Sequence, residues 1–537
     1  MQWNLADLFE LVAETCPERP ALLHGTHGIA RTWREVDRRA NALARHFAHG
    51  HRPGDKISIY AHNRPEFVEA LMGAMKARLV PVNVNYRYRE DELAYLFDNS
   101  DSTVVVYEAT YADRVAKVRD RVPNVREWIE LDDGAPGNAF ALPYEQIVGA
   151  GAERLDVRRS PDDLLFLYTG GTTGMPKGVM WTQSALWHTL GGGGNVVLGE
   201  KPSASLEEQQ GRIADASRAQ RLLPGSPLMH GTGLFTTLNA LGGGGACVTL
   251  PSRSLDAVEL WSTVEARQVA AISIVGDAFA KPMLKALDEH PGRWDLSSCK
   301  LIVSSGVMWS PQVKQGLLRH LSQAVLFDSF GSSEATGFGA EITARGMTTQ
   351  IGRFRIGPSC KVFTPDGLEV QPGSGEAGFV ARSGPIPLGY YKDEKKTAET
   401  FRTLQGVRWA IPGDWCTVNE DGTLNLLGRG SVCINTGGEK VYPEEIEETL
   451  KAHPDVYDAV VVGVPDEKWG EAVTALVELR PAANASEEEL RLVVRERLAG
   501  YKTPKHVVFV PSIGRSPSGK VDYKGLKALA KQRLGVS

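Results

Sequence analysis

Residues 56–82 carry the local pattern that decides the fold class. They read Lys56-Ile-Ser-Ile-Tyr60, then Pro65-Glu-Phe-Val-Glu-Ala-Leu-Met-Gly-Ala-Met75, and then Leu79-Val-Pro-Val82. The outer segments are short apolar runs typical of buried strands, and the middle segment has apolar residues at helical spacing. This order predicts a strand–helix–strand unit, the building block of α/β sheets.

The alternation of strands and helices recurs along most of the chain. Apolar runs near 103–107, 270–275 and 300–304 are separated by helical stretches. We therefore expect α/β sheets that bind ligands at the carboxyl ends of their strands.

The character of the sequence changes in its last third. After about Asp366, turn signals such as Asp421-Gly422 separate short strands and indicate a small β-rich subdomain. Beyond Gly430, a helix opening at Pro443 and a buried strand at 456–464 indicate a compact α+β module. The expected domains are therefore residues 1–430 and residues 431–537.

Composition excludes several classes of protein. The 537 residues include 42% hydrophobic and 23% charged residues, which is incompatible with wholesale disorder. With 60 Lys plus Arg against 65 Asp plus Glu, no basic excess exists to bind nucleic acid or anionic lipid by charge alone. The six cysteines form no C-x-x-C pair, which favours reduced thiols and a cytoplasmic location over disulfides or a metal site.

Two uncharged stretches, Gly178–Gly199 and Leu222–Ser252, need a separate explanation. Glycine runs interrupt both, and the second also contains three prolines. A membrane span needs about 20 predominantly apolar residues, so we expect no transmembrane segment. We expect both stretches to be buried and to line an apolar pocket.

The most informative segment for function is Leu164-Leu-Phe-Leu-Tyr-Thr-Gly-Gly-Thr-Thr-Gly-Met-Pro-Lys-Gly-Val179. A buried apolar run leads into a loop rich in glycine, threonine and one lysine. Glycines let backbone N–H groups approach a phosphate, while hydroxyls add donors and lysine adds charge. The spacing is not that of a Walker A loop. A plain surface turn is the alternative. The residues that we expect to hold phosphate are Thr169, Gly170, Gly171, Thr172, Thr173, Gly174 and Lys177.

This loop resembles the phosphate-binding signature of the AMP-forming adenylating superfamily, which comprises acyl-CoA synthetases, luciferases and adenylation domains. Further segments resemble the family's motifs, in the family's order and over nearly the whole chain. They are Pro227-Leu-Met-His-Gly-Thr-Gly233, Ser304-Ser-Gly-Val-Met308, Asp328-Ser-Phe-Gly-Ser-Ser-Glu334, Pro412-Gly-Asp414, Gly428-Arg429, Ile434-Asn-Thr-Gly-Gly438 and Pro517-Ser-Gly-Lys520.

The resemblance implies an α/β fold with a large N-terminal domain and a small mobile α+β C-terminal domain. The N-terminal domain would contain two α/β sheets and a small β-rich subdomain. It also implies ATP and Mg²⁺ as cofactors and coenzyme A as co-substrate. Two further segments, Asn83-Val-Asn-Tyr-Arg-Tyr88 and Asn435-Thr-Gly-Gly-Glu-Lys-Val-Tyr442, resemble bacterial synthetases of the FadD type, which include enzymes acting on steroid side chains.

The resemblance also assigns roles to individual residues. Catalysis would depend on Lys520, Glu334 and His230, with Glu334 and Ser333 holding Mg²⁺. The adenine would lie against Ser305, Gly306, Val307, Asp328, Ser329, Phe330 and Gly331, the ribose against Asp414 and Arg429, and the pantetheine arm against Gly437 and Gly438. Considered alone, some of these residues have a simpler interpretation. Asp414 could be a solvated acid, Phe330 a core aromatic, His230 a structural histidine and Lys520 a surface lysine.

The sequence departs from the common family pattern at several positions. Gly170, Ser333, Phe330 and Pro412 are mild changes, whereas Ser431, Val432 and Asn435 bear on the hinge and on the second half-reaction.

The implied activity is that of an ATP-dependent acid–CoA ligase for a fatty or bulky alicyclic acid. An aromatic acid is the alternative substrate, a luciferase the alternative branch, and a non-catalytic adenylate-binding regulator the alternative class. The expected partners are the carboxylic acid, ATP and CoA and not nucleic acid, and the sequence allows a homodimer.

Overall fold

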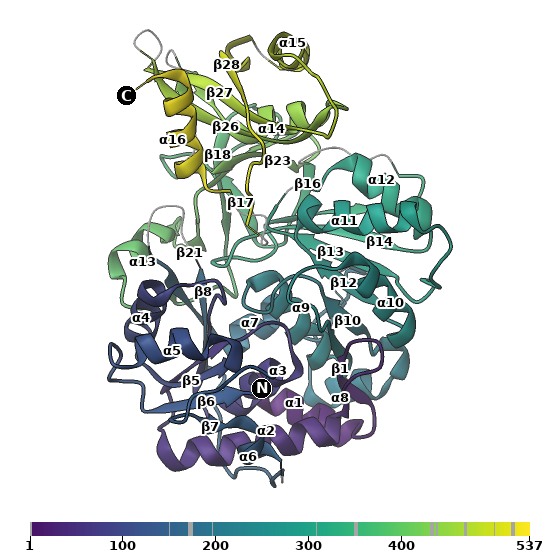
Figure 1. The fold of residues 1–537 in the computed structure, drawn as a ribbon, viewed down its shortest axis with the longest axis vertical. Coiled ribbons are helices and arrows are strands. Elements are labelled where there is room, and N and C mark those ends of the chain that lie inside the picture. Colours follow the sequence, from purple (N-terminus) through teal and green to yellow (C-terminus); the bar gives the residue numbers. More distant parts are fainter. Residues whose placement is uncertain are drawn as a thin grey trace.

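The computed structural model describes residues 3–149, 151–169, 175–195, 197–307, 309–347, 353–429, 434–436, 439–466, 470–498, 500–516 and 521–536. Its elements form two large sheets flanked by helices and a separate C-terminal module (Figure 1). The predicted α/β class is confirmed. The predicted boundary at residues 430 and 431 lies outside the described residues.

The strand–helix–strand unit of residues 56–82 is present as predicted. Strand β3 (Lys56–Tyr60) leads into helix α3 (Pro65–Lys76) and then into β4 (Val80–Asn83). Pro65 occupies the first turn of α3, where its missing N–H costs no hydrogen bond. β3 and β4 pair in parallel, with Lys56 opposite Val80, so their carboxyl ends lie at the same edge of the sheet.

This unit belongs to the smaller of the two large sheets. Its strands are, in spatial order, β19 (Gly389–Tyr390), β9 (Lys177–Thr182), β8 (Leu164–Thr169), β4, β3, β5 (Ser102–Glu108), β6 (Glu127–Leu131) and β7 (Leu142–Pro143). β4 pairs in parallel with β8, whereas β8 and β9 form an antiparallel pair. β8 and β9, the strands before and after the glycine-rich loop, therefore lie next to the parallel strands β4 and β3 in this sheet.

The larger sheet joins the second α/β region to the β-rich region. Its strands are, in order, β2 (Ala30–Thr32), β1 (Pro20–His24), β11 (Ala246–Thr249), β10 (Arg221–Pro224), β12 (Ala271–Ile274), β13 (Leu301–Ser305), β14 (Val325–Phe330), β15 (Gly339–Thr343), β16 (Arg353–Ile356), β23 (Thr423–Arg429), β22 (Asp414–Val418), β18 (Ala377–Arg382), β21 (Val407–Ala410) and β20 (Phe401–Leu404), with β17 (Cys360–Phe363) beside β18. The β-rich part is thus hydrogen-bonded to the α/β part through β14 to β23.

Helices of the N-terminal region cover both sheets. They are α1 (Leu5–Thr15), α2 (Trp33–Gly50), α4 (Glu90–Asn99), α5 (Ala112–Arg119), α6 (Tyr144–Val148), α7 (Gln183–Thr189), α8 (Leu206–Ala214), α9 (Gly231–Gly242), α10 (Ala257–Arg267), α11 (Gly276–Glu289), α12 (Pro311–His320) and α13 (Glu394–Thr400), in addition to α3. A single cluster of buried apolar side chains includes residues of α1, α2, α3 and α9 together with strands of both sheets. The two sheets therefore share one core.

The C-terminal module is a small sheet packed against helices. Its strands are β24 (Ile434–Thr436), β25 (Glu439–Val441), β26 (Val456–Asp466), β27 (Gly470–Leu479) and β28 (His506–Phe509), and its helices are α14 (Pro443–Lys451), α15 (Glu487–Arg497) and α16 (Tyr523–Leu534). Ser486 and Glu489 form the capping box at the start of α15. Figure 1 shows this module at one end of the longest axis of the molecule.

Within the described part of the chain, no helix is both long enough and apolar enough to cross a membrane. The two uncharged stretches instead form β9 and α7 in the first case and β10, α9 and β11 in the second. Cys16, Cys247, Cys299 and Cys416 are buried free thiols.

Candidate active site

The strands that flank the glycine-rich loop are in direct register. Thr169, the last residue of β8, pairs with Lys177, the first residue of β9. The Lys177 ammonium forms an ion pair with Asp393, the N-cap residue of α13. This hydrogen bond lowers the pKa of Asp393 and keeps its carboxylate charged. Gly170, Gly171, Thr172, Thr173 and Gly174 lie outside the described residues.

The candidate Mg²⁺ motif lies beside β9. The indole Nε1 of Trp181 on β9 donates to the backbone oxygen of Ser333 at 3.1 Å. The Tyr390 hydroxyl donates to Glu334 Oε1 at 2.6 Å, and Tyr390 pairs with Val179 of β9 in the sheet. The structure therefore brings the Ser333-Glu334 pair to the strand that leaves the glycine-rich loop.

The surroundings of Glu334 fit a magnesium ion bound together with nucleotide phosphates. Glu334 is 9% exposed and accepts from Tyr390 through Oε1, and its carboxylate would hold the metal. No cluster of three or more His, Cys, Asp or Glu side chains suited to a metal occurs among the described residues. Mg²⁺ commonly binds through one or two carboxylates plus phosphate and water, which agrees with a single acid here.

The candidate adenine site lies at the carboxyl ends of two parallel strands. On β13 and β14, Ser304 pairs with Asp328 and Ser305 pairs with Ser329. Gly306 follows with φ of +92°, a backbone conformation that favours glycine. The two predicted segments are thus adjacent in space, because both strands end at the same edge.

Asp328 is buried between cationic and anionic neighbours. The Lys314 ammonium on α12 donates to Asp328 Oδ2 at 3.0 Å and to Glu341 Oε2 at 2.8 Å. Burial raises the pKa of Asp328 to about 6, although Lys314 acts to lower it. Lys314 therefore holds this carboxylate in place from behind the strand.

Phe330 lies in an aromatic cluster at the end of β14. Its ring centroid is 5.3 Å from that of Phe338 and 5.4 Å from that of Phe354, and it is only 8% exposed. Phe330 therefore contributes to the core of the molecule in this arrangement. Its stacking on adenine remains a prediction.

The two residues assigned to the ribose meet in the larger sheet. Asp414, at the start of β22, pairs directly with Arg429, at the end of β23. Asp414 is 7% exposed. The short motifs 412–414 and 428–429, separate in sequence, therefore form one local feature.

His230 is the N-cap residue of α9 and directly follows Met229, whose backbone oxygen accepts from Asn83. The Asn83 side chain donates to the backbone oxygens of Met229 and of Tyr168, the latter at 3.0 Å. Its Oδ1 also accepts from the Tyr168 N–H at 2.6 Å. Asn83 thus holds the segment before His230 next to the end of β8.

A cavity of about 520 Å³ lies between the N-terminal domain and the C-terminal module. Pro227, Arg253 and Val307 line it on one side, and Tyr457, Arg515 and Ser516 line it on the other. The cavity therefore borders the predicted acyl motif, the adenine-side loop and the segment that precedes 517–520. Lys281 bridges the two sides, because its ammonium donates to the Tyr457 backbone oxygen at 2.9 Å.

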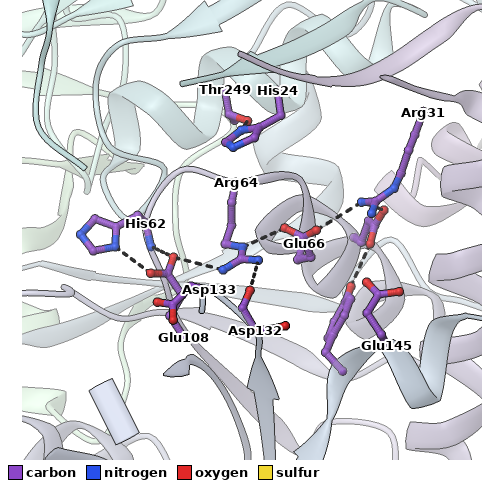
Figure 2. Close-up of polar contacts among 12 residues, drawn as sticks. His24, Arg31, His62, Arg64, Glu66, Glu108, Asp132, Asp133, Glu145 and Thr249 are labelled. Carbon is purple, nitrogen blue, oxygen red and sulfur yellow. Dashed lines mark hydrogen bonds and ion pairs between the residues drawn. The ribbon is translucent and has the colours of Figure 1, made fainter. Parts of the chain in front are cut away.

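A buried ionic network stands behind one wall of this cavity (Figure 2). His62, which lines the cavity, donates from Nδ1 to Glu108 Oε2 at 3.0 Å. Arg64 donates to Glu66 at 2.8 Å and to the backbone oxygen of Asp132 at 3.0 Å. Figure 2 shows Arg64 between His62 and Glu66. His62 and Arg64 follow β3, Glu66 lies in the first turn of α3, Glu108 ends β5 and Asp132 follows β6. The network therefore joins His62, which lines the cavity, to the end of β5.

Some of the predicted site residues belong to segments that the structure does not describe. Lys520, Gly437, Gly438 and the hinge positions Ser431 and Val432 lie outside the described residues. The strands β24 and β25 flank 437–438, and Ser516 directly precedes 517–520.

Sequence reasoning missed the residues that support the site. Tyr390 binds Glu334, Asp393 pairs with Lys177, and Lys314 holds Asp328. None of them lies in a motif that we identified, and Asp393 is 216 residues from Lys177. Asn83 begins the segment 83–88 that resembles FadD-type synthetases, but that resemblance assigns it no role. Such partners carry no local spacing signal, because each acts across the fold.

Comparison with known proteins agrees with this geometry. The model of the AMP-binding enzyme family matches residues 9–391, and that of the AMP-binding enzyme C-terminal domain matches residues 445–520. A medium/long-chain-fatty-acid–CoA/3-oxocholest-4-en-26-oate–CoA ligase of Mycobacterium tuberculosis is 44% identical over 537 residues, covering 99% of this chain and 96% of that protein.

Two further comparisons point the same way. A 3-oxocholest-4-en-26-oate–CoA ligase of Rhodococcus rhodochrous is also 44% identical, over 98% of this chain and 96% of that protein. The crystal structure of the anthranilate CoA ligase AuaEII with anthranoyl-AMP shares the fold, with a TM-score of 0.84 at 21% identity over 100% of this chain and 98% of that chain. The chain belongs to the AMP-binding enzyme family.

Proposed function

We propose that this protein is an ATP-dependent, AMP-forming acid–CoA ligase. In the first half-reaction, a carboxylate oxygen bonds to the α-phosphorus of ATP and pyrophosphate leaves with the electrons of the broken P–O bond. In the second, the thiolate of CoA bonds to the acyl carbon and AMP leaves. The observation that supports the proposal is the placement of Ser333 and Glu334 against β9, the strand that follows the glycine-rich loop.

The first half-reaction brings several anions together, so catalysis depends on offsetting their charge. Lys177 and the donors Thr169, Gly170, Gly171, Thr172, Thr173 and Gly174 would bind the phosphates. Glu334, with Ser333 beside it, would hold Mg²⁺, which neutralises phosphate charge when bound. Lys520 would add one cation near the α-phosphate while the acyl-adenylate forms.

The remaining site residues would orient the substrates. Asp414 and Arg429 would bind the ribose, and their direct pairing in the sheet supports a joint role. The segments 305–307 and 328–331 would hold the adenine, supported by their adjacent strand ends. His230 would orient the acid, and Gly437 with Gly438 would admit the pantetheine arm because they carry no side chain.

We further propose that the domains are residues 1–430 and 431–537, and that the second domain rotates near Ser431 between the half-reactions. In the arrangement described, Ser516 and Val307 line the same cavity. This proximity supports an adenylate-forming arrangement of the two domains. The buried free thiols support a cytoplasmic location. A homodimer remains compatible with these features.

We propose a fatty or bulky alicyclic acid, such as a steroid side-chain acid, as the substrate. The names of the 44% identical relatives support this class. An aromatic acid is the competing substrate. A non-catalytic regulator is the competing class of protein, and the presence of Glu334, Asp414, Arg429 and Lys520 argues against it.

A screen of CoA-dependent AMP release over acids of graded chain length and ring content tests this proposal. Each buried methylene contributes about 0.8 kcal/mol, which corresponds to about a four-fold rise in kcat/KM per carbon until the pocket is full. Acetate preferred over octanoate and larger acids would contradict the substrate class. No pyrophosphate release with any acid would favour the regulator.

Separate measurement of the half-reactions tests the two-domain mechanism. Lys520→Ala removes a charge that stabilises the transition state, so adenylation should fall by at least about 10²–10³-fold. The same variant should still convert synthetic acyl-AMP and CoA to thioester at nearly the wild-type rate. Gly437→Leu should spare adenylation and block thioester formation. Equal losses in both half-reactions of Lys520→Ala would contradict a rotating domain.

A further inference from the structure

The chain that enters 517–520 is fixed to β26 by a two-point ionic contact. Arg515 donates from Nε to Asp458 Oδ2 at 2.6 Å and from Nη2 to Asp458 Oδ1 at 2.9 Å. The two side chains are 18% and 12% exposed. A bidentate guanidinium–carboxylate pair fixes orientation as well as distance, which a lysine at this position would not do.

The neighbouring strand holds the same segment at a second point. Glu478 on β27 lies opposite Asp458 on β26, and its Oε2 accepts from the backbone N–H of Ile513 at 2.7 Å. Ile513 is itself buried in the apolar core between β26 and α16. The backbone from 513 to 515 is therefore attached to two adjacent strands.

The chain that leaves 517–520 is attached to the same region. The hydroxyl of Tyr523, the first residue of α16, donates to Glu447 Oε1 at 3.3 Å. Glu447 is 4% exposed, and its Oε1 also accepts from the Val461 N–H of β26 at 2.9 Å. The segment before 517–520 is thus attached to β26 and β27. Tyr523, beyond 517–520, is attached to α14, whose Glu447 binds β26.

This anchoring region also contacts the N-terminal domain. The pairing of β26 with β27 shifts between Val456 and Asp458, so Tyr457 bulges from the ladder. Tyr457 receives the Lys281 hydrogen bond and lies below the Lys281 ammonium, 4.9 Å from its ring centroid. The strand that holds Arg515 is therefore itself located relative to the nucleotide-binding domain.

We infer that Asp458 and Arg515 are positioning residues for adenylation, which fix the start of the segment that carries Lys520. The inference rests on the role of Lys520 in the proposed function. A single cation stabilises developing phosphate charge only from one place, and a displacement of about 1 Å can cost about 10²-fold in rate. Once acyl-AMP has formed, Lys520 has no further role, so the pair affects only the first half-reaction.

The test measures both half-reactions on full-length variants. Arg515→Met paired with Asp458→Asn removes both charges without leaving a buried carboxylate unpaired. Arg515→Lys keeps the charge and loses the two-point geometry. Tyr523→Phe removes only the hydroxyl on the far flank. Lys527→Met is the matched control, because Lys527 on α16 pairs with Glu471 and touches neither Asp458 nor Arg515.

The double variant should lose about 10²-fold in ATP-dependent acyl-AMP formation. It should convert synthetic acyl-AMP and CoA to thioester at nearly the wild-type rate. Arg515→Lys should lie between the double variant and wild type, and Tyr523→Phe should show a smaller loss in the same half-reaction. Lys527→Met should resemble wild type in both. Thermal unfolding identifies variants that fail to fold. If the double variant fails to fold, Arg515→Lys and Tyr523→Phe still test the inference.

Three outcomes would overturn the inference. Equal losses in both half-reactions would mean that the pair only stabilises the domain. A raised KM for CoA in the second half-reaction would mean that Arg515, which also lines the cavity, contacts CoA instead. No loss of adenylation would mean that Lys520 is positioned otherwise.

Lys520→Ala measured in parallel separates this inference from the proposed function. If Lys520→Ala abolishes adenylation and the Arg515 variants do not, the positioning role alone fails. If Lys520→Ala retains full adenylation, the role of Lys520 fails and the inference fails with it. If wild type forms no acyl-AMP from any acid, the proposed function fails.

Discussion

At the residue scale, the site depends on side chains that hold other side chains. The Tyr390 hydroxyl binds one oxygen of Glu334 and thereby sets the direction of the other. Lys314 does the same for Asp328, and Asn83 for the backbone before His230. A ligand to a metal or a nucleotide is precise only when its own rotamer is fixed by such partners.

Tyr390→Phe should weaken Mg²⁺ binding without changing the fold. The Glu334 carboxylate loses the bond that orients it, and loss of such a partner typically costs about 10–100-fold in metal affinity. The measurement is the dependence of AMP release on Mg²⁺ at saturating ATP. Tyr391→Phe is the control, because its hydroxyl binds Asp101 at 2.7 Å and not Glu334. The same Mg²⁺ requirement in both variants would show that Tyr390 does not orient the ligand.

At the element scale, ion pairs fasten helices to the sheets. Glu127 at the start of β6 accepts hydrogen bonds from His46 on α2 and from His51 just beyond its end, the latter at 2.9 Å. Burial acts to raise the pKa of Glu127, but the two histidine bonds lower it to about 2. The carboxylate therefore attaches the end of α2 to β6 of the smaller sheet.

Glu127→Gln should lower stability in a pH-dependent way. Because the folded pKa of about 2 lies below the unfolded value near 4.5, the stabilisation is present above pH 4.5 and is lost as the pH falls toward 2. The difference from wild type should be at most about 3 kcal/mol at pH 7. Urea unfolding at several pH values measures it. A difference that stays constant from pH 7 to pH 3 would show that the carboxylate charge is not the cause.

At the scale of the whole molecule, Lys281 makes one of the contacts between the two domains, and Trp415 packs against Tyr442 in another. Lys281 on α11 donates to the Tyr457 backbone oxygen and lies over its ring. The contact belongs to the arrangement in which both domains line the cavity of about 520 Å³. The contact is polar, which suits the proposal that the two domains separate and re-form between the half-reactions.

Lys281→Met should shift the balance between domain arrangements. A hydrogen bond from a charged group contributes about 1.5–3 kcal/mol when buried and less at a partly exposed site, so adenylation should fall about three- to ten-fold. Thioester formation from acyl-AMP should be unchanged or faster. Energy transfer between labels on α11 and α15 measures the arrangement. Lys285→Met is the control on the same helix, and an equal effect of both substitutions would exclude a specific contact.

The local pattern of the sequence determined much of the fold and the motifs of the site. Apolar periodicity predicted β3 and α3, and Pro443 predicted the start of α14. These features depend on residues a few positions apart, whose geometry is set by hydrogen bonds within one element. The order of the motifs along the sequence likewise indicated the family without knowledge of the tertiary structure.

Tertiary structure alone decided how those motifs meet and what holds them. It joined the β-rich strands to the larger sheet through β14 to β23, and it brought Asp393 to Lys177, Tyr390 to Glu334 and Asp458 to Arg515. Each of these contacts joins residues from different elements, so its existence depends on how whole elements pack. Burial then gives a single ion pair its precision, because a buried charge must be matched by a partner in one orientation.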